Sequence, residues 1–368
     1  MSTEQASAYE AAGVDYETLD AAKRAAITAA GGTGDFSILH GGSVDGRSRG
    51  ESATVINIGP LRLGFVLECL GTKSMLASTY LEATGIDRFD AIGYDTVAAV
   101  VNDCVCVGAL PVVVNAYFAT GAASFYSGTR HASLIAGWVQ GCADAGATWG
   151  GGESPTLSGL IAPNEIDLAG AAIGRVPDAI EPILGEALRP GDEIVLIASS
   201  GLHANGASLV RSLADTLPGG LTEVLPSGRQ LGDAVLDPSV IYVRLVAAML
   251  RQKVPVHYLS HVTGHGLRKL MRPNRELRYV IETLPEVPEV LAFIAERSGL
   301  SPKEAYGTLN MGVGFACYVG NGAGVEVVAL AEALGHQATV AGVVEEGAKS
   351  VVLEPVAVHY ERDELELH

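Results

Sequence analysis

The stretch EIVLIASSGLHANGASLVRSLA, residues 193–214, places a hydrophobic run, a glycine-containing loop and a helical run in direct succession. EIVLIA predicts a buried strand, and SLVRSLA has the apolar spacing of a helix. The first backbone N–H groups of a helix have no partner within it, so a loop that leads from a strand into a helix can bind an anion. We interpret residues 199–206 as such a loop. Alternatively, Asn205 could simply cap the helix and His203 could lie on the surface.

A second loop with the same strand-to-helix character occupies residues 261–266, HVTGHG. His261 and His265 are four residues apart, a spacing that suits zinc only on a helix, and the glycines between and after them argue against a helix here.

Residues 68–73, ECLGTK, follow a predicted strand and combine a glycine, a hydroxyl and a lysine. Such a turn can offer N–H groups and one ammonium to a phosphate. The Walker A pattern is absent, so an ordinary turn is the alternative.

Three polar residues interrupt the apolar helix predicted over residues 91–107, namely Asp95, Asn102 and Asp103. Asp95 and Asn102 fall about 20° apart on one helical face, so they could converge on one ligand. Buried charges need a ligand or a cation. The alternative is a capping role for Asp95 and a buried hydrogen-bond network for the other two.

Glu153 ends the glycine run WGGGE, which includes Gly151 and Gly152. Glycines allow a ligand to approach the backbone closely, and a carboxylate there suits Mg²⁺, which prefers one or two carboxylates plus phosphate oxygens. A flexible hairpin loop is the alternative.

The pattern of strands, helices and turns divides the chain into an N-terminal arm (residues 1–50), a first unit (51–180) and a second unit (181–368). The expected strands and helices of the first unit are strands on both sides of a turn at residues 59–60 within 53–67, a strand over 165–174, and helices over 91–107 and 131–145. In the second unit, Asp237 and Pro238 predict a helix start. We expect a closing strand over residues 351–358 and a charged tail in the last ten residues.

Composition limits the possible partners and compartments. The 368 residues carry a formal net charge of −18, which disfavours nucleic acid and anionic membranes. The most apolar window, residues 97–119, is interrupted by polar residues and a proline, so no membrane span is expected. The five cysteines lack disulfide or zinc spacing. We expect a soluble protein of the reducing cytoplasm with five buried free thiols.

Taken in order, these segments resemble the aminoimidazole ribonucleotide synthetase family, the phosphoribosylformylglycinamidine cyclo-ligases. The similarity covers roughly residues 8 to 350. It is carried by the motifs YEAAGVD (9–15), GTK (71–73), GYD (93–95), VND (101–103), ATG (119–121), GGE (151–153), SSGLHANGASLVR (199–211), IYV (241–243), HVTG (261–264) and LNMGVG (309–314).

The resemblance implies a mixed α+β or α/β fold, in which the N-terminal domains of a homodimer join their strands into a shared barrel flanked by C-terminal α/β domains. It implies ATP and Mg²⁺ as cofactors, a small phosphorylated substrate, and phosphoryl transfer to the formyl oxygen before closure of an imidazole ring. Such chemistry requires positioning and charge neutralisation rather than a nucleophilic triad.

The residues that match the family motifs become candidates for particular roles. Candidate catalytic residues are Lys73, Asp95 and His203. Candidate ATP-binding residues are Gly71, Thr72, Lys73, Asn102, Asp103, Gly151 and Gly152. Candidate substrate-binding residues are Ser200, His203, Asn205, His261, Thr263 and Gly264, and candidate metal ligands are Glu68, Asp95 and Glu153.

Four positions depart from the family pattern. Glu68 and Ala116 each stand where an aspartate is usual, Thr156 replaces a second acid after GGE, and His265 replaces a glycine. Two alternatives to the cyclo-ligase therefore remain: a paralogue that phosphorylates another small substrate, and a catalytically silent, ligand-binding dimer.

Overall fold

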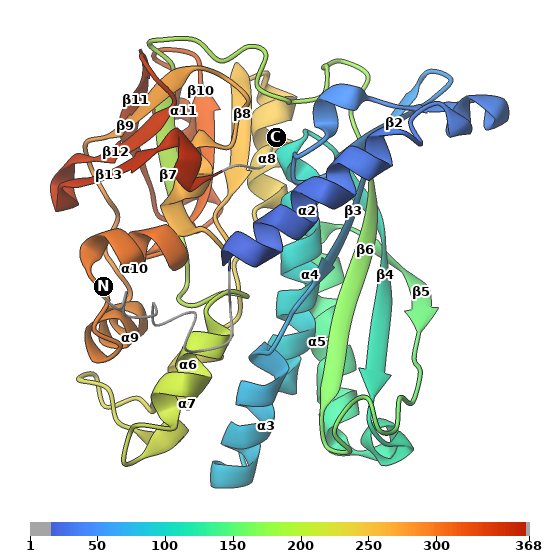
Figure 1. The fold of residues 1–368 in the computed structure, drawn as a ribbon, viewed down its shortest axis with the longest axis vertical. Coiled ribbons are helices and arrows are strands. Elements are labelled where there is room, and N and C mark those ends of the chain that lie inside the picture. The colour runs from blue at the N-terminus through green and yellow to red at the C-terminus, as the bar shows by residue number, and fades with distance from the viewer. Residues whose placement is uncertain (1–15, 366–368) are drawn as a thin grey trace, which may run out of the picture.

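The computed structural model describes residues 16–365, and its strands form two sheets that lie side by side (Figure 1). The similar segment at residues 9–15 and the end of the expected tail lie outside the described residues. The first sheet has the order β1-β2-β3-β6-β4-β5 and the second the order β13-β12-β9-β11-β7-β10-β8. The fold is therefore mixed, as the sequence predicted.

The first half of the chain supplies α2 (Tyr16–Gly31), β1 (Gly42–Val44), β2 (Thr54–Ile58), β3 (Leu61–Cys69), α3 (Lys73–Thr84), α4 (Phe89–Cys106), β4 (Leu110–Thr120), α5 (Thr129–Ala145), β5 (Thr148–Glu153) and β6 (Ile166–Arg175). The predicted strands around the turn at residues 59–60, the strand at 165–174 and both predicted helices are confirmed. Residues 16–50 contain a 16-residue helix and a strand paired with β2, so this part of the chain is more structured than an extended arm.

The second half supplies β7 (Glu193–Ala198), α6 (Ala207–Ala214), α7 (Leu231–Val235), α8 (Val243–Gln252), β8 (Val256–His261), β9 (Leu277–Ile281), α9 (Glu289–Arg297), α10 (Pro302–Thr308), β10 (Val313–Val319), α11 (Gly324–Ala333), β11 (Ala338–Glu346), β12 (Ser350–Leu353) and β13 (Val358–Glu361). Short 3-10 helices include η5 (Gly266–Met271). The strand expected over 351–358 is two antiparallel strands separated by a 3-10 turn, and the tail begins inside β13.

Helix α4 is the central element of the molecule. It packs on β3, β6 and β4 of the first sheet and also contacts β8 and α8 of the second half. Its other neighbour, α5, approaches it closely because both helices carry a glycine at the crossing: a Cβ on Gly137 would lie 1.8 Å from the carbonyl oxygen of Asp90. Polar residues on α4 therefore lie between the two halves of the molecule.

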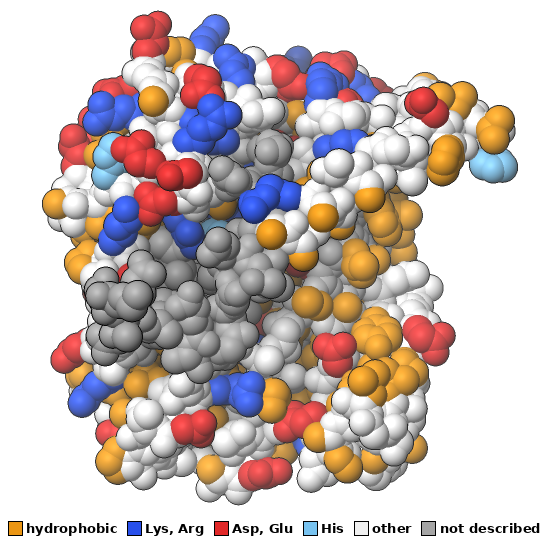
Figure 2. All heavy atoms as spheres, viewed as in Figure 1, with side chains coloured by type: hydrophobic (Ala, Val, Ile, Leu, Met, Phe, Trp, Pro, Cys, Tyr) orange, Lys and Arg blue, Asp and Glu red, His pale blue; other side chains and the backbone are white. Residues whose placement is uncertain are grey.

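The face of the first sheet that α4 does not cover is apolar. Along β3, Gly64 and Val66 point to the core, whereas Phe65 is 41% and Leu67 is 67% exposed. Ile173 of β6 pairs with Phe65 and continues the same surface. Figure 2 shows hydrophobic side chains gathered on the side of the molecule where β3, β6 and β4 lie. The described part of the sheet is open, with β1 and β5 at its edges.

Within the described range, no helix is long and apolar enough to cross a membrane. All five cysteines are free, and four of them are buried. Cys69 at the end of β3 is exposed, so the expectation of five buried thiols is wrong at this position.

Candidate functional site

The turn that leads into α3 meets the loop that leads into α6. Gly71 adopts a φ of 69°, and α3 begins at Lys73 directly after Thr72. The Thr72 hydroxyl lies 3.1 Å from the Ser208 hydroxyl in the first turn of α6. Two helix N-termini, each with unpaired backbone N–H groups, are thus joined side by side, an arrangement that favours an anion.

The loop at residues 199–206 is hydrogen-bonded to the segment that precedes β10. Asn310 accepts a hydrogen bond from the Ser199 hydroxyl at 2.8 Å and donates to the carbonyl oxygen of Gly201 at 2.8 Å. Gly206, with a φ of 97°, is the N-cap of α6, so the alternative that Asn205 caps this helix is wrong. His203 is buried rather than on the surface. Asn310 lies within the family motif at residues 309–314, although it is not among the candidate site residues that the sequence indicates.

Lys73, Asp95 and His203 are brought together by the fold. The Lys73 ammonium donates to the Asp95 carboxylate at 2.5 Å and to the carbonyl oxygen of His203 at 2.6 Å. The side chains of Lys73 and Asp95 are both fully buried. The second carboxylate oxygen of Asp95 accepts from the N–H of Ser239 at 2.7 Å. The polar groups of this pair are therefore engaged with the protein itself.

Asn102 binds the same neighbouring segment, residues 239–242. Its amide donates to the carbonyl oxygen of Val240 at 2.8 Å, and its oxygen accepts from the N–H of Tyr242 at 2.8 Å. These contacts explain why the helix start predicted at Asp237 is wrong. Side chains of α4 take the N–H groups of Ser239 and Tyr242, and α8 begins only at Val243.

The half-buried Glu68 and the buried Asp103 and His261 form a second cluster, from β3, α4 and β8. The His261 Nδ1 lies 2.7 Å from an Asp103 carboxylate oxygen. Burial raises the pKa of Asp103, but the hydrogen bond and the charge of His261 outweigh burial and hold it below its ordinary value. Burial, with the charge and hydrogen bond of Asp103, raises the pKa of Glu68 to about 7. Asp103 therefore adds to the effect of burial in favouring the protonated form of Glu68.

Lys269 completes this cluster, and sequence reasoning missed it. It lies on η5, is 8% exposed, and donates a hydrogen bond to the Thr263 hydroxyl. Burial lowers its pKa, against the attraction of Asp103 and Glu68. Gly264, the remaining candidate in this loop, lies between Thr263 and His265. A lysine on a short 3-10 helix has no periodicity that would mark it as buried, so no sequence signal identifies it.

Glu153 lies apart from both clusters. It ends the edge strand β5 together with Gly151 and Gly152; all three are exposed, and its carboxylate accepts from the N–H of Ser154. Over residues 16–365, no group of three or more His, Cys, Asp and Glu side chains is placed to hold a metal ion. The described chain thus does not gather Glu68, Asp95 and Glu153 around one ion.

The departures from the family pattern have distinct structural settings. Ala116 lies in the core of the first sheet, in register with Gly170, which itself pairs with Glu68. Thr156 is exposed and bridges to Thr120 beyond the end of β5. His265 adopts a φ of 70°, a left-handed conformation that glycine enters without cost, which is consistent with the usual glycine at this position.

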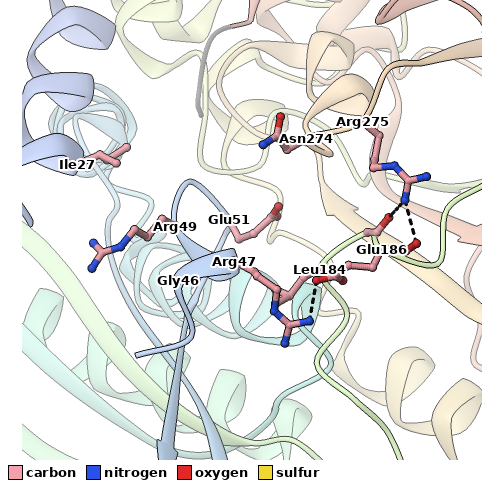
Figure 3. A pocket seen from close by; sticks show the side chains of 10 residues that line it. Ile27, Gly46, Arg47, Arg49, Glu51, Leu184, Glu186, Asn274 and Arg275 are labelled. Atoms are coloured by element: carbon pink, nitrogen blue, oxygen red, sulfur yellow. Dashed lines mark hydrogen bonds and ion pairs between the residues drawn. The ribbon is translucent and has the colours of Figure 1, made fainter. Parts of the chain in front are cut away.

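A cavity of about 470 Å³ lies between the N-terminal segment and the second half (Figure 3). Arg47 donates to the Glu186 carboxylate, and Arg275 donates to the carbonyl oxygens of Gly185 and Glu186. Both arginines thus hydrogen-bond to the segment that connects the two sheets. None of the candidate site residues lines this cavity, so it is separate from the candidate site.

Two family models match the chain: the AIR synthase related protein N-terminal domain over residues 50–176 and the C-terminal domain over residues 189–354. The chain belongs to the AIR synthase related family. Phosphoribosylformylglycinamidine cyclo-ligase of Alkaliphilus oremlandii is 35% identical over 290 residues, 77% of this chain and 82% of that protein. The protein of the same name from Methanobrevibacter smithii is 31% identical over 268 residues, 72% of this chain and 75% of that protein.

Solved structures share the fold of this AIR synthase relative. Hydrogenase maturation protein HypE in complex with ATP matches with a TM-score of 0.58 and 18% identity, covering 83% of this chain and 85% of that one. Thiamine monophosphate kinase from Aquifex aeolicus matches with a TM-score of 0.55 and 16% identity, covering 83% and 92%. At these identities the likeness shows the fold alone.

Proposed function

We propose that this chain catalyses the ATP-dependent ring closure of formylglycinamidine ribonucleotide to aminoimidazole ribonucleotide in purine biosynthesis. Family membership supports this reaction. The main structural support is the cluster of Glu68, Asp103 and His261, which come from three distant segments of the sequence. Lys269 and Thr263 adjoin them.

The reaction needs two steps in which atoms and electrons balance. The γ-phosphoryl group of ATP passes to the formyl oxygen of the substrate, so that a new P–O bond forms and ADP leaves. A substrate nitrogen then attacks the same carbon, the C–O bond breaks, phosphate leaves as the ring closes, and the attacking nitrogen releases a proton to solvent. We assign the binding of phosphate oxygens to the N–H groups at the starts of α3 and α6, where the hydroxyls of Thr72 and Ser208 meet.

The residues that fit Mg²⁺ best are Glu68 and Asp103. Burial, and after it the charge of Asp103, raises the pKa of Glu68, so the two carboxyl groups interact. A divalent ion prefers one or two carboxylates plus phosphate oxygens, and these two acids would supply the carboxylates. When bound, the ion would neutralise phosphate charge. Asp95 fits less well because Lys73 and Ser239 already occupy its oxygens, and Glu153 is remote from this pair in the described chain.

We further propose a homodimer formed through the first sheet, with a division of the chain near residue 180 and with cytoplasmic location. The apolar outer face of β3 and β6 supports the dimer, because a second copy would bury it. The four buried free thiols fit a reducing compartment.

A specific observation supports a second candidate, a paralogue that phosphorylates another substrate. Ala116 and Thr156 carry no charge where acids are usual, and the buried ammonium of Lys269 lies beside the remaining pair of acids. These differences alter the charge around the phosphates, to which phosphoryl transfer is sensitive.

Steady-state ATP hydrolysis with and without formylglycinamidine ribonucleotide separates the candidates. We expect turnover on the order of 1–10³ s⁻¹ that depends on this substrate. A rate of ATP hydrolysis that is the same with and without formylglycinamidine ribonucleotide would favour the paralogue. A protein that binds ATP without hydrolysing it under any of these conditions would contradict both enzymatic readings.

A further inference from the structure

Of the three residues with the strongest claim to catalysis on sequence grounds, Lys73 is hydrogen-bonded to the other two. The Lys73 ammonium binds the Asp95 carboxylate at 2.5 Å and the carbonyl oxygen of His203 at 2.6 Å. The side chains of Lys73 and Asp95 have no exposed surface, and His203 is 4% exposed. In this arrangement the ammonium of Lys73 is directed to the Asp95 carboxylate and to a backbone carbonyl oxygen.

The His203 ring accepts hydrogen bonds at Nε2. The N–H of Ser200 lies 3.1 Å from this atom and the N–H of Val240 lies 3.4 Å from it. A backbone amide can only donate, so Nε2 must present its lone pair and the ring proton must sit on Nδ1. Nδ1 has no hydrogen-bond partner among residues 16–365. Protonation of Nε2 would break both contacts, so this imidazole is poorly suited to accept a proton during catalysis.

Burial agrees with this geometry. Burial away from water is the largest cause that holds the pKa of His203 well below its ordinary value of 6.5, and the charges of His261 and Lys73 add to it. The ring therefore stays neutral near physiological pH, and its constant feature is the acceptor at Nε2.

The His203 Nε2 acceptor joins two segments that are distant in the sequence. Ser200 and Val240 belong to the loop at 199–206 and to the segment at 239–242. The Ser200 hydroxyl also donates to the carbonyl oxygen of Pro238 at 2.6 Å, and Asp95 accepts from Ser239. The Lys73/Asp95/His203 network thus fixes the loop immediately before α6, the helix whose Ser208 hydroxyl contacts the Thr72 hydroxyl.

We propose that Lys73, Asp95 and His203 are positioning residues that hold loop 199–206 in its anion-binding conformation, rather than groups that exchange a proton or a phosphoryl group with the substrate. The inference rests on the proposed function only in placing a phosphate-bearing ligand at this loop. It also explains why His203 keeps a left-handed backbone with a φ of 57°, a conformation that the surrounding contacts must maintain.

Two substitutions at one position separate positioning from acid–base chemistry. In His203→Gln the side-chain oxygen can occupy the place of Nε2, whereas in His203→Asn it reaches only the place of Nδ1. Neither variant titrates near neutral pH. A left-handed backbone favours asparagine over glutamine, so local propensity alone would rank the Asn variant higher. The matched control is His359→Asn, at a half-exposed histidine on β13.

We expect His203→Gln to keep KM and kcat within about threefold of the parent. We expect His203→Asn to raise KM for the phosphorylated substrate, and Kd for inorganic phosphate, about tenfold with a smaller change in kcat, as the loss of a buried acceptor predicts. The pH profile of kcat should be the same in all variants. A loss of 10²-fold or more in kcat in both variants, with loss of one limb of that profile, would overturn the proposal.

Amide hydrogen exchange of residues 199–206 tests the inference even if the parent does not turn over formylglycinamidine ribonucleotide. Faster exchange in His203→Asn than in His203→Gln and the parent supports positioning. Equal exchange in all three overturns it and leaves the reaction assignment to its own assay. If the Asn variant does not fold, the kcat and pH profile of the Gln variant decide.

Discussion

Two separate pairs of buried ionisable side chains lie along α4. Asp95 pairs with Lys73 near the first turns of the helix, and Asp103 pairs with His261 near its end. A buried carboxylate is tolerated when a cation and hydrogen bonds compensate its lost hydration. The helix that carries both acids contacts both halves of the molecule, so each acid can find its partner on a different segment.

The Lys73 and Asp95 pair should behave as a coupled unit. Lys73→Met leaves a buried carboxylate without its cation, so we expect the free energy of unfolding to fall by about 3–5 kcal/mol. Adding Asp95→Asn to the same chain removes the orphaned charge and should restore part of that loss. Urea unfolding of the single and double variants measures the coupling. Losses that simply add would mean that the two side chains do not interact.

Glu68 should make stability depend on pH in a predictable direction. Its pKa is about 7 in the folded protein against an ordinary value of 4.5. Between these values the folded state holds more protons than the unfolded state, so stability falls as pH rises from about 4.5 to 7. Glu68→Gln removes this titration and should raise stability above pH 7 by on the order of 2 kcal/mol.

The measurement is thermal unfolding without divalent ions at several pH values between 4 and 8. The difference between Glu68→Gln and the parent should grow with pH over this range and level off above about 7. A difference that is constant with pH would show that Glu68 ionises as an ordinary exposed glutamate.

At the scale of elements, the segment at 239–242 is set by side chains rather than by its own sequence. Asn102 makes two hydrogen bonds to it, and its partners are backbone groups of Val240 and Tyr242. In Asn102→Leu these backbone groups lose their partner inside the protein. We expect stability to fall by about 2 kcal/mol and the amide of Tyr242 to exchange faster. Asn164→Leu, at an exposed loop position, is the control.

Unchanged exchange at Tyr242 in Asn102→Leu would mean that α8 can begin earlier, as its sequence alone suggests. The sequence contains a good helix start at Asp237 and Pro238, yet Asp237 pairs with Arg229 at 2.8 Å and α8 begins at Val243. Tertiary contacts therefore override the local helix propensity of residues 237–242.

Helix α5 and strands β3 and β6 were predictable because their burial follows a regular period. Apolar spacing also predicted α4, although this helix is buried on almost all sides. The candidate site was predictable only in part. Motif resemblance selected Glu68, Asp103 and His261, whose contacts were then found. Lys269 lacked any such mark, and the hydrogen-bond role of His203 depends on Ser200 and Val240, which no local pattern connects to it.

At the scale of the whole molecule, the first sheet has one covered and one open face. Helix α4 covers the inner face, and the outer face exposes Phe65, Leu67 and Ile173 in neighbouring positions. A contiguous apolar surface of this kind usually marks a contact with another protein. A second copy of the same chain is the simplest partner, because a two-fold axis lets one patch cover itself.

Leu67→Glu should therefore convert the proposed dimer into a monomer. Leu67 is 67% exposed in the single chain, so a glutamate there costs the isolated subunit little, but it would place one charge from each subunit in the apolar contact. Val325→Glu on α11 is the control, because Val325 is 70% exposed and lies in the second half of the chain. Light scattering at micromolar concentration should give twice the mass of 38.0 kDa for the parent and for Val325→Glu, and the single mass for Leu67→Glu. A parent protein with the mass of a monomer would contradict the proposed dimer. A dimeric Leu67→Glu protein would move the contact to another surface.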